Sequence, residues 1–97
     1  MGFRPTALGW IDTSVSTSPV WDRAQVQRLA KHLGFFVLWE EPSLVPLADH
    51  VRDSDVDALI VPSPEHLDPL TLNAVLHVAD IETVCPRMSF ARWRVNV

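Results

Sequence analysis

Cysteine is almost absent from this sequence, because Cys85 is the only one among 97 residues. A single thiol excludes an internal disulfide and the structural zinc sites that need several cysteine ligands. No window approaches the roughly 18 consecutive apolar residues of a membrane-spanning helix. The N-terminal stretch, MGFRPTALGW, lacks the apolar segment of a signal peptide. We therefore expect a cytoplasmic protein without membrane contact, bound metal or cofactor.

An excess of positive charge is also lacking. The formal net charge is −4 at pH 7 and the isoelectric point is about 5.4, which is the wrong sign for a domain that binds nucleic acid by neutralising phosphates. Hydrophobic residues make up 47% of the chain and charged residues 21%, as in ordinary globular domains. We interpret residues 1–97 as a single domain, and we do not expect it to bind DNA in isolation.

Short apolar runs alternate with stretches of helical periodicity. The runs predict strands at residues 6–11, 35–40, 57–62 and 81–84, and a possible fifth strand at 90–95 that would lie at a sheet edge. Nearly continuous apolar strands joined by helices are typical of a parallel sheet. The expected fold is a three-layer α/β/α sandwich with a mainly parallel sheet of four to five strands.

Helix boundaries are marked by capping residues. Ser18 and Pro19 predict the start of a first helix that ends at Gly34, and Asp68 and Pro69 predict the start of a third. The second helix follows a turn at residues 41–43, with Pro46 in its first turn. The predicted core faces are Val26, Leu29, Ala30 and Leu33 in the first helix, Leu44, Leu47, Ala48 and Val51 in the second, and Leu72, Val75, Leu76 and Ala79 in the third.

Two loops, residues 12–18 and 63–68, follow the first and third predicted strands. In open parallel sheets, ligands bind beyond the carboxyl ends of the strands, where such loops converge. These two loops are therefore the first places to look for a site.

The order and spacing of these segments resemble the N-terminal catalytic domain of serine recombinases, the resolvase and invertase family. The resemblance covers about residues 7–80 and is carried by WIDTS at 10–14, LAKHLGF at 29–35, DSDVDALIV at 53–61 and EHL at 65–67. It implies a resolvase-like α/β domain in which Ser14 stands at the position of the serine that attacks DNA. The chain is shorter than a recombinase, because it ends where the family has a long oligomerisation helix and a DNA-binding domain.

The two loops depart from the family pattern. Family members read Tyr-Ile-Arg-Val-Ser in the first loop, whereas Asp12 stands here in place of the arginine. In the third-strand loop Glu65 keeps the acid, but His66 replaces an arginine and no basic residue follows. Attack on a phosphodiester needs cations around the phosphate. We therefore interpret the chain as a non-catalytic relative that serves as a small binding or regulatory module.

Two other site chemistries remain open. Ser14, Glu65 and His66 are the catalytic residues if the domain is an active recombinase component, and Asp12 or Glu65 could complete a Ser/His/acid arrangement. Alternatively, hydroxyls before the first helix could bind a phosphate, a nucleotide or another small anion; the candidates are Thr13, Ser14, Ser16 and Ser18.

Metal binding is not expected, because the four histidines are dispersed along the sequence. We interpret them as helix-end or surface residues: His32, His50, His66 and His77.

Aromatic residues suggest an interface with a protein partner or a second copy of the chain. Four tryptophans are many for 97 residues, and two or three of them are expected in the core: Trp10, Trp21, Trp39 and Trp93. Aromatic residues combined with arginine are enriched at interfaces. The C-terminal edge strand carries such a group, and the predicted contact residues are Phe90, Arg92, Trp93 and Arg94.

Overall fold

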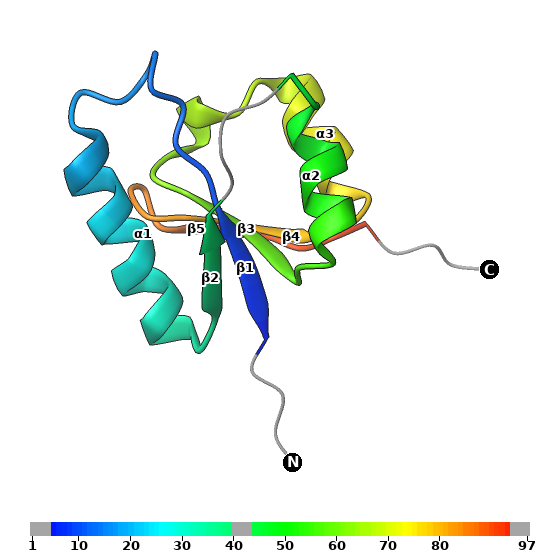
Figure 1. Ribbon diagram of the computed structural model, residues 1–97, viewed down its shortest axis with the longest axis horizontal. Coiled ribbons are helices and arrows are strands. Elements are labelled where there is room, and N and C mark those ends of the chain that lie inside the picture. The colour runs from blue at the N-terminus through cyan, green and yellow to red at the C-terminus, as the bar shows by residue number, and fades with distance from the viewer. Residues whose placement is uncertain (1–4, 40–43, 94–97) are drawn as a thin grey trace.

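The computed structural model describes residues 5–39 and 44–93, and Figure 1 shows a five-stranded sheet with helices on both of its sides. In chain order the elements are β1 (Thr6–Gly9), α1 (Pro19–Leu33), β2 (Phe36–Trp39), α2 (Leu47–Ser54), β3 (Ala58–Val61), the 3-10 helix η1 (Pro64–His66), α3 (Pro69–Leu76), β4 (Asp80–Thr83) and β5 (Met88–Phe90). The predicted α/β class is confirmed.

The sheet has the strand order β2-β1-β3-β4-β5. Strands β1 to β4 are parallel to their neighbours, and β5 is antiparallel to β4. Parallel neighbours require crossover connections, which α1, α2 and α3 supply. The mainly parallel sheet predicted from the apolar runs is therefore confirmed, with five strands in the described part of the chain.

Side chains alternate between the two faces of the sheet and bury two clusters. Ala7, Ala58 and Ile60 lie on one face and pack against Val26 and Ala30 of α1. The other face carries Leu8, Leu59, Val61 and Ile81, which form a cluster with Val51 of α2 and Val75 and Leu76 of α3. Figure 1 shows the same division, with α1 on one side and α2 and α3 on the other.

The helix boundaries predicted from capping residues agree with the structure. The Ser18 hydroxyl accepts from the backbone N–H of Trp21 at the start of α1, and Asp68 Oδ1 accepts from the N–H of Thr71 over 2.8 Å at the start of α3. Gly34 ends α1 with φ of +86°, a left-handed conformation that glycine adopts without strain.

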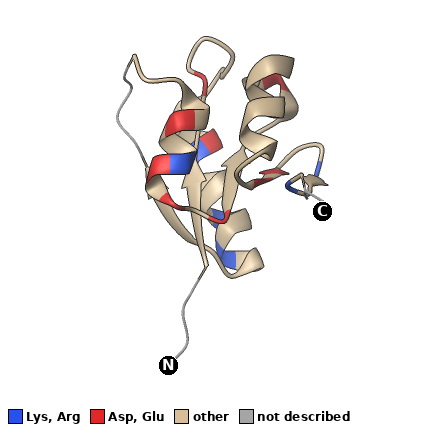
Figure 2. Cartoon of the chain, turned by 90° about the vertical axis from the view of Figure 1, so that its right-hand side faces the viewer, with Lys and Arg blue, Asp and Glu red and all other residues tan. Residues whose placement is uncertain are grey.

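The second helix differs from its prediction. Pro46 occupies the N-cap position, so α2 begins at Leu47, and Leu44 lies outside it with a fully exposed side chain. Leu44 is therefore not part of the core stripe, whereas Leu47, Ala48 and Val51 are. Arg52 pairs with Asp49 at 2.6 Å on the exposed side of this helix. Figure 2 shows acidic and basic residues along the chain, viewed from the side on which α2 and α3 lie in Figure 1.

The last strand also differs from its prediction. β5 covers Met88–Phe90 rather than 90–95, and residues from 94 onward lie outside the described part. After Phe90 the backbone leaves the ladder, because the N–H of Arg92 donates to Asp80 Oδ1 over 2.7 Å and that of Trp93 to Leu76 O over 2.7 Å. Smaller shifts affect other ends: β1 stops at Gly9, α3 stops at Leu76, and β4 begins at Asp80.

Candidate functional site

The strand order places a natural binding position beside β1. The chain passes from β1 outward to β2 and then returns across β1 to form β3 on its other side. Where the direction of winding reverses in this way, the loops after the two strands separate and leave a crevice at the carboxyl edge of the sheet. The two loops singled out from the sequence, after β1 and after β3, both begin at this edge.

A hydrogen bond joins these two loops. The backbone N–H of Asp12 donates to Nδ1 of His66 over 2.9 Å. Because Nδ1 accepts this hydrogen bond, the ring nitrogen that carries a proton is Nε2. His66 is the last residue of η1, as a helix-end histidine, but it is only 6% exposed, so its interpretation as a surface residue was wrong. His50 lies within α2 rather than at its end.

Ser14 is held by the carboxylate of Asp12. Its backbone N–H donates to Asp12 Oδ1 over 2.9 Å, and its hydroxyl donates to the same oxygen over 2.6 Å. The hydrogen bonds from Ser14 lower the pKa of Asp12 against the opposing effect of burial, with a smaller contribution from His66. Asp12 therefore remains charged at neutral pH and stands beside the hydroxyl that the resemblance makes a nucleophile.

The geometry does not join Ser14 to a general base. His66 Nδ1 is occupied by the Asp12 N–H, and no hydrogen bond connects His66 with Ser14 within residues 5–39 and 44–93. A carboxylate with a lowered pKa is a weak base for a serine hydroxyl. Ser14 and His66 thus meet at Asp12 without forming a nucleophile and base pair.

The carboxyl edge beyond β3 is acidic. A pocket of about 350 Å³ is lined there by Asp12, Glu65, His66 and Asp68, together with Trp10, Leu47, Leu67 and Thr71. None of these described lining residues is a lysine or an arginine. Asp68 is committed to capping α3, and its hydrogen bonds with Thr71 lower its pKa. A phosphate entering this pocket would meet negative charge.

Two of the candidate hydroxyls before α1 are engaged within the loop. Ser16 Oγ donates to Asp22 Oδ2 and accepts from the N–H of Ser18 over 3.2 Å, while Ser18 Oγ caps the helix. Pro19 at the first helical position has no N–H, and Asp22 places a negative charge in the first turn. Thr13 is exposed and lines a second pocket. These features weaken the start of α1 as an anion site.

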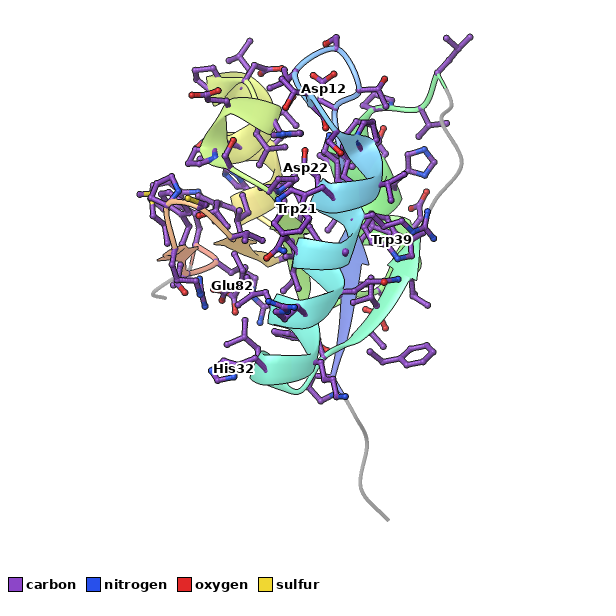
Figure 3. The ribbon with its side chains drawn as sticks, turned by 90° about the vertical axis from the view of Figure 1, so that its left-hand side faces the viewer. Asp12, Trp21, Asp22, His32, Trp39 and Glu82 are labelled. Carbon is purple, nitrogen blue, oxygen red and sulfur yellow. The ribbon has the colours of Figure 1, made fainter. Side chains whose placement is uncertain are left out.

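The second pocket was not predicted from the sequence. It has a volume of about 400 Å³ and lies between β1, β2 and the start of α1. Trp39 is the register partner of Gly9, and its ring lies across that glycine, where an added Cβ would approach Cη2 to 2.6 Å. The guanidinium of Arg23 covers the ring, with Cζ 4.4 Å from the ring centroid. Figure 3 shows Trp39 beside α1 and Asp12 near the end at which this helix begins.

Of the predicted interface residues, Phe90 is half-buried against the core, whereas Arg92 and Trp93 are exposed. Trp93 is 55% exposed and its ring centroid lies 6.2 Å from that of His77. Arg94 lies outside the described residues. Trp10 and Trp39 pack against the two core clusters, while Trp21 is 63% exposed.

Among the described residues no group of three or more histidine, cysteine, aspartate or glutamate side chains is arranged to hold a metal ion. The helices in the same residues are too short or too polar to cross a bilayer. Comparisons with protein-family models, with curated proteins and with solved structures found no significant match to the chain.

Proposed function

We propose that this chain is a resolvase-like three-layer domain that does no recombinase chemistry and acts as a binding module for a protein partner. The partner would contact the edge formed by β5 and the segment that follows it. The observation that carries the proposal is the engagement of Ser14 by the carboxylate of Asp12 over 2.6 Å, at the position where the family resemblance implies an arginine.

The electrostatics of the carboxyl edge support binding rather than phosphoryl transfer. A transition state for attack on a phosphodiester gains negative charge, which arginine or a metal ion must stabilise. Asp12, Glu65 and Asp68 lie at this edge, and Nδ1 of the neighbouring His66 is engaged by the backbone N–H of Asp12. Arg23, at the adjacent pocket, is stacked on Trp39. DNA is therefore a poor ligand for this surface.

The segment after β5 supports a protein contact. β5 is the last strand of the sheet, so one side of its backbone pairs with no further strand in the described chain. Trp93 is exposed on a backbone that is fixed by its bond to Leu76 O. A large aromatic side chain on an ordered backbone loses little conformational freedom when a partner covers it. Strand edges also accept an additional strand from a partner.

The test compares Trp93→Ala with Trp21→Ala. Both tryptophans are more than half exposed, but Trp21 lies on α1, which packs on the other face of the sheet from α3, the helix whose Leu76 carbonyl accepts from the N–H of Trp93. Sedimentation of the full chain over a range of concentrations reports whether a second copy is the partner. We expect Trp93→Ala to lower self-association and Trp21→Ala to leave it unchanged.

If the wild-type protein stays monomeric, the partner is not a second copy of the chain, and the test must look for a different protein. A photo-crosslinking residue at position 93 should then capture a defined protein in the source cells, which a matched residue at position 21 does not capture. Equal crosslinking from both positions, together with a monomeric wild type, would contradict the proposed interface.

A further inference from the structure

The pocket beside Trp39 has the form of a small-molecule site. Its volume of about 400 Å³ falls within the usual range for ligand pockets. Much of its wall is apolar and comes from Trp10, Ile11, Pro19, Val20 and Trp39. Such a wall favours a ligand with an apolar or aromatic body.

Arg23 gives the pocket a positive charge, and no ion pair with another described residue neutralises it. Its guanidinium stacks on the ring of Trp39, and no carboxylate of the described chain pairs with it. A guanidinium that lies over an aromatic ring still has N–H groups that can donate hydrogen bonds. A carboxylate can accept two parallel hydrogen bonds from such a group.

Trp39, which lines the pocket, also carries a buried donor. The indole Nε1 of Trp39 is buried and lacks an acceptor in the described part of the chain. Buried donors without partners are rare in folded proteins. The guanidinium of Arg23 can donate but cannot accept, so the complementary ligand group is an acceptor. The charge on Arg23 selects an anionic acceptor over a neutral one.

Asp12 limits the charge that the ligand can carry. It also lines this pocket, and hydrogen bonds from Ser14 lower its pKa, so it is charged at neutral pH. A phosphate or another multiply charged anion would be repelled more strongly than a single carboxylate. The pocket is thereby matched to a monoanion whose remaining body is apolar.

We propose that the pocket formed by Gly9, Trp39, Arg23 and the start of α1 binds a small monocarboxylic acid with an apolar or aromatic body, its carboxylate held by Arg23. This inference goes beyond the proposed protein contact and does not depend on it. The pocket lies at the β2 side of the sheet, whereas the proposed interface lies at the β5 edge.

The test is a titration of the ¹⁵N-labelled full chain with benzoate at millimolar concentration, followed by amide and indole N–H shifts. Benzamide has the same ring without the charge, and inorganic phosphate supplies charge without the apolar body. We expect benzoate to shift residues 9–13 and the Trp39 indole N–H in a saturable way. The affinity for benzamide and for phosphate should be lower than that for benzoate by a factor of about ten or more.

Arg23→Gln and Arg28→Gln provide the matched variants. Both remove one positive charge from exposed positions of α1, but Arg28 lies near His32 and Val84, outside this pocket. Arg23→Gln should weaken benzoate binding about tenfold or more, and Arg28→Gln should leave it unchanged. The proposal is overturned if benzoate shifts none of residues 9–13, if benzamide binds equally well, or if the two variants behave alike. Trp93→Ala should bind benzoate normally, which separates this proposal from that of the protein interface.

Discussion

The backbone N–H of Asp12 and Nδ1 of His66 are joined by a 2.9 Å hydrogen bond between residues 54 positions apart in the chain. The same Asp12 receives both the N–H and the hydroxyl of Ser14 on its carboxylate. Asp12 therefore forms hydrogen bonds with both candidate catalytic side chains, His66 and Ser14. Its backbone engages the imidazole nitrogen that could have acted as a base, and its side chain engages the hydroxyl that could have acted as a nucleophile.

The Asp12–His66 hydrogen bond should contribute to stability. His66→Ala removes the acceptor and leaves the part-buried N–H of Asp12 without its partner. We expect the free energy of unfolding to fall by roughly 1–3 kcal/mol, from the unpaired donor and the lost packing. Urea unfolding followed by circular dichroism measures this change.

His66→Asn and His32→Ala are the comparisons for this measurement. The Oδ1 of asparagine can stand near the position of Nδ1 and should recover part of the loss. His32 is exposed in the last turn of α1, so its removal should change stability by no more than about 0.5 kcal/mol. Equal losses for His66→Ala and His66→Asn would show that the hydrogen bond contributes little.

Acid should weaken the fold through Asp12. Hydrogen bonds from Ser14 lower its folded-state pKa below the usual value of 3.8. A depressed pKa contributes stability that is fully present above the unfolded-state pKa and is lost as the pH falls through the folded-state pKa. The stability difference between wild type and Asp12→Asn should therefore be constant near neutral pH and shrink below pH 3.8.

Asp53→Asn is the control for this pH series. Asp53 is exposed, and it forms a 4.0 Å ion pair with Arg52. It should show a small difference from wild type in urea titrations across the same range. An Asp12→Asn difference that stays constant through the acid range would mean that the carboxylate is not stabilised in the folded state.

Ser14 should not form a covalent link with DNA. The negative carboxylate at its hydroxyl and the acidic pocket beside it disfavour the approach of a phosphodiester. Supercoiled DNA incubated with excess protein and analysed under denaturing conditions should give no protein-linked species, for wild type and Ser14→Ala alike. An adduct formed by wild type and absent from Ser14→Ala would restore the enzyme interpretation.

Local signals in the sequence were sufficient to predict most of the elements. Ser18 with Pro19, Gly34, and Asp68 with Pro69 act on residues within a few positions, and the structure places each at the predicted helix end. The apolar run at β3 is buried at every position. Leu44 was assigned to the wrong environment because its spacing fits the stripe of α2, whereas Pro46 sets a later start for the helix.

The missed features depend on which strands become neighbours. His66 is buried because η1 lies against the loop after β1, and that proximity follows from the non-sequential pairing of β1 with β3. Trp39 lies on Gly9 only because the parallel pairing of β1 with β2 has the register that makes them partners. Neither register nor strand order can be read from periodicity, so the Trp39 pocket had no signal in the sequence.

Gly9 should be required for the position of the Trp39 ring. A Cβ at residue 9 would approach three ring atoms to between 2.6 and 2.8 Å, so the ring must move. Gly9→Ala should lower the free energy of unfolding by about 1–3 kcal/mol. In a Trp39→Leu background the same substitution should cost much less, because the opposing ring is gone.

Gly34→Ala distinguishes this effect from a general intolerance of glycine replacement. Gly34 has φ of +86° with nothing within 4 Å of an added Cβ, so alanine there is strained by its backbone conformation alone, at about 1 kcal/mol. That cost should be the same with tryptophan or leucine at position 39. If the cost of Gly9→Ala also fails to depend on residue 39, the ring does not lie on Gly9, and the pocket loses the floor on which its proposed ligand would rest.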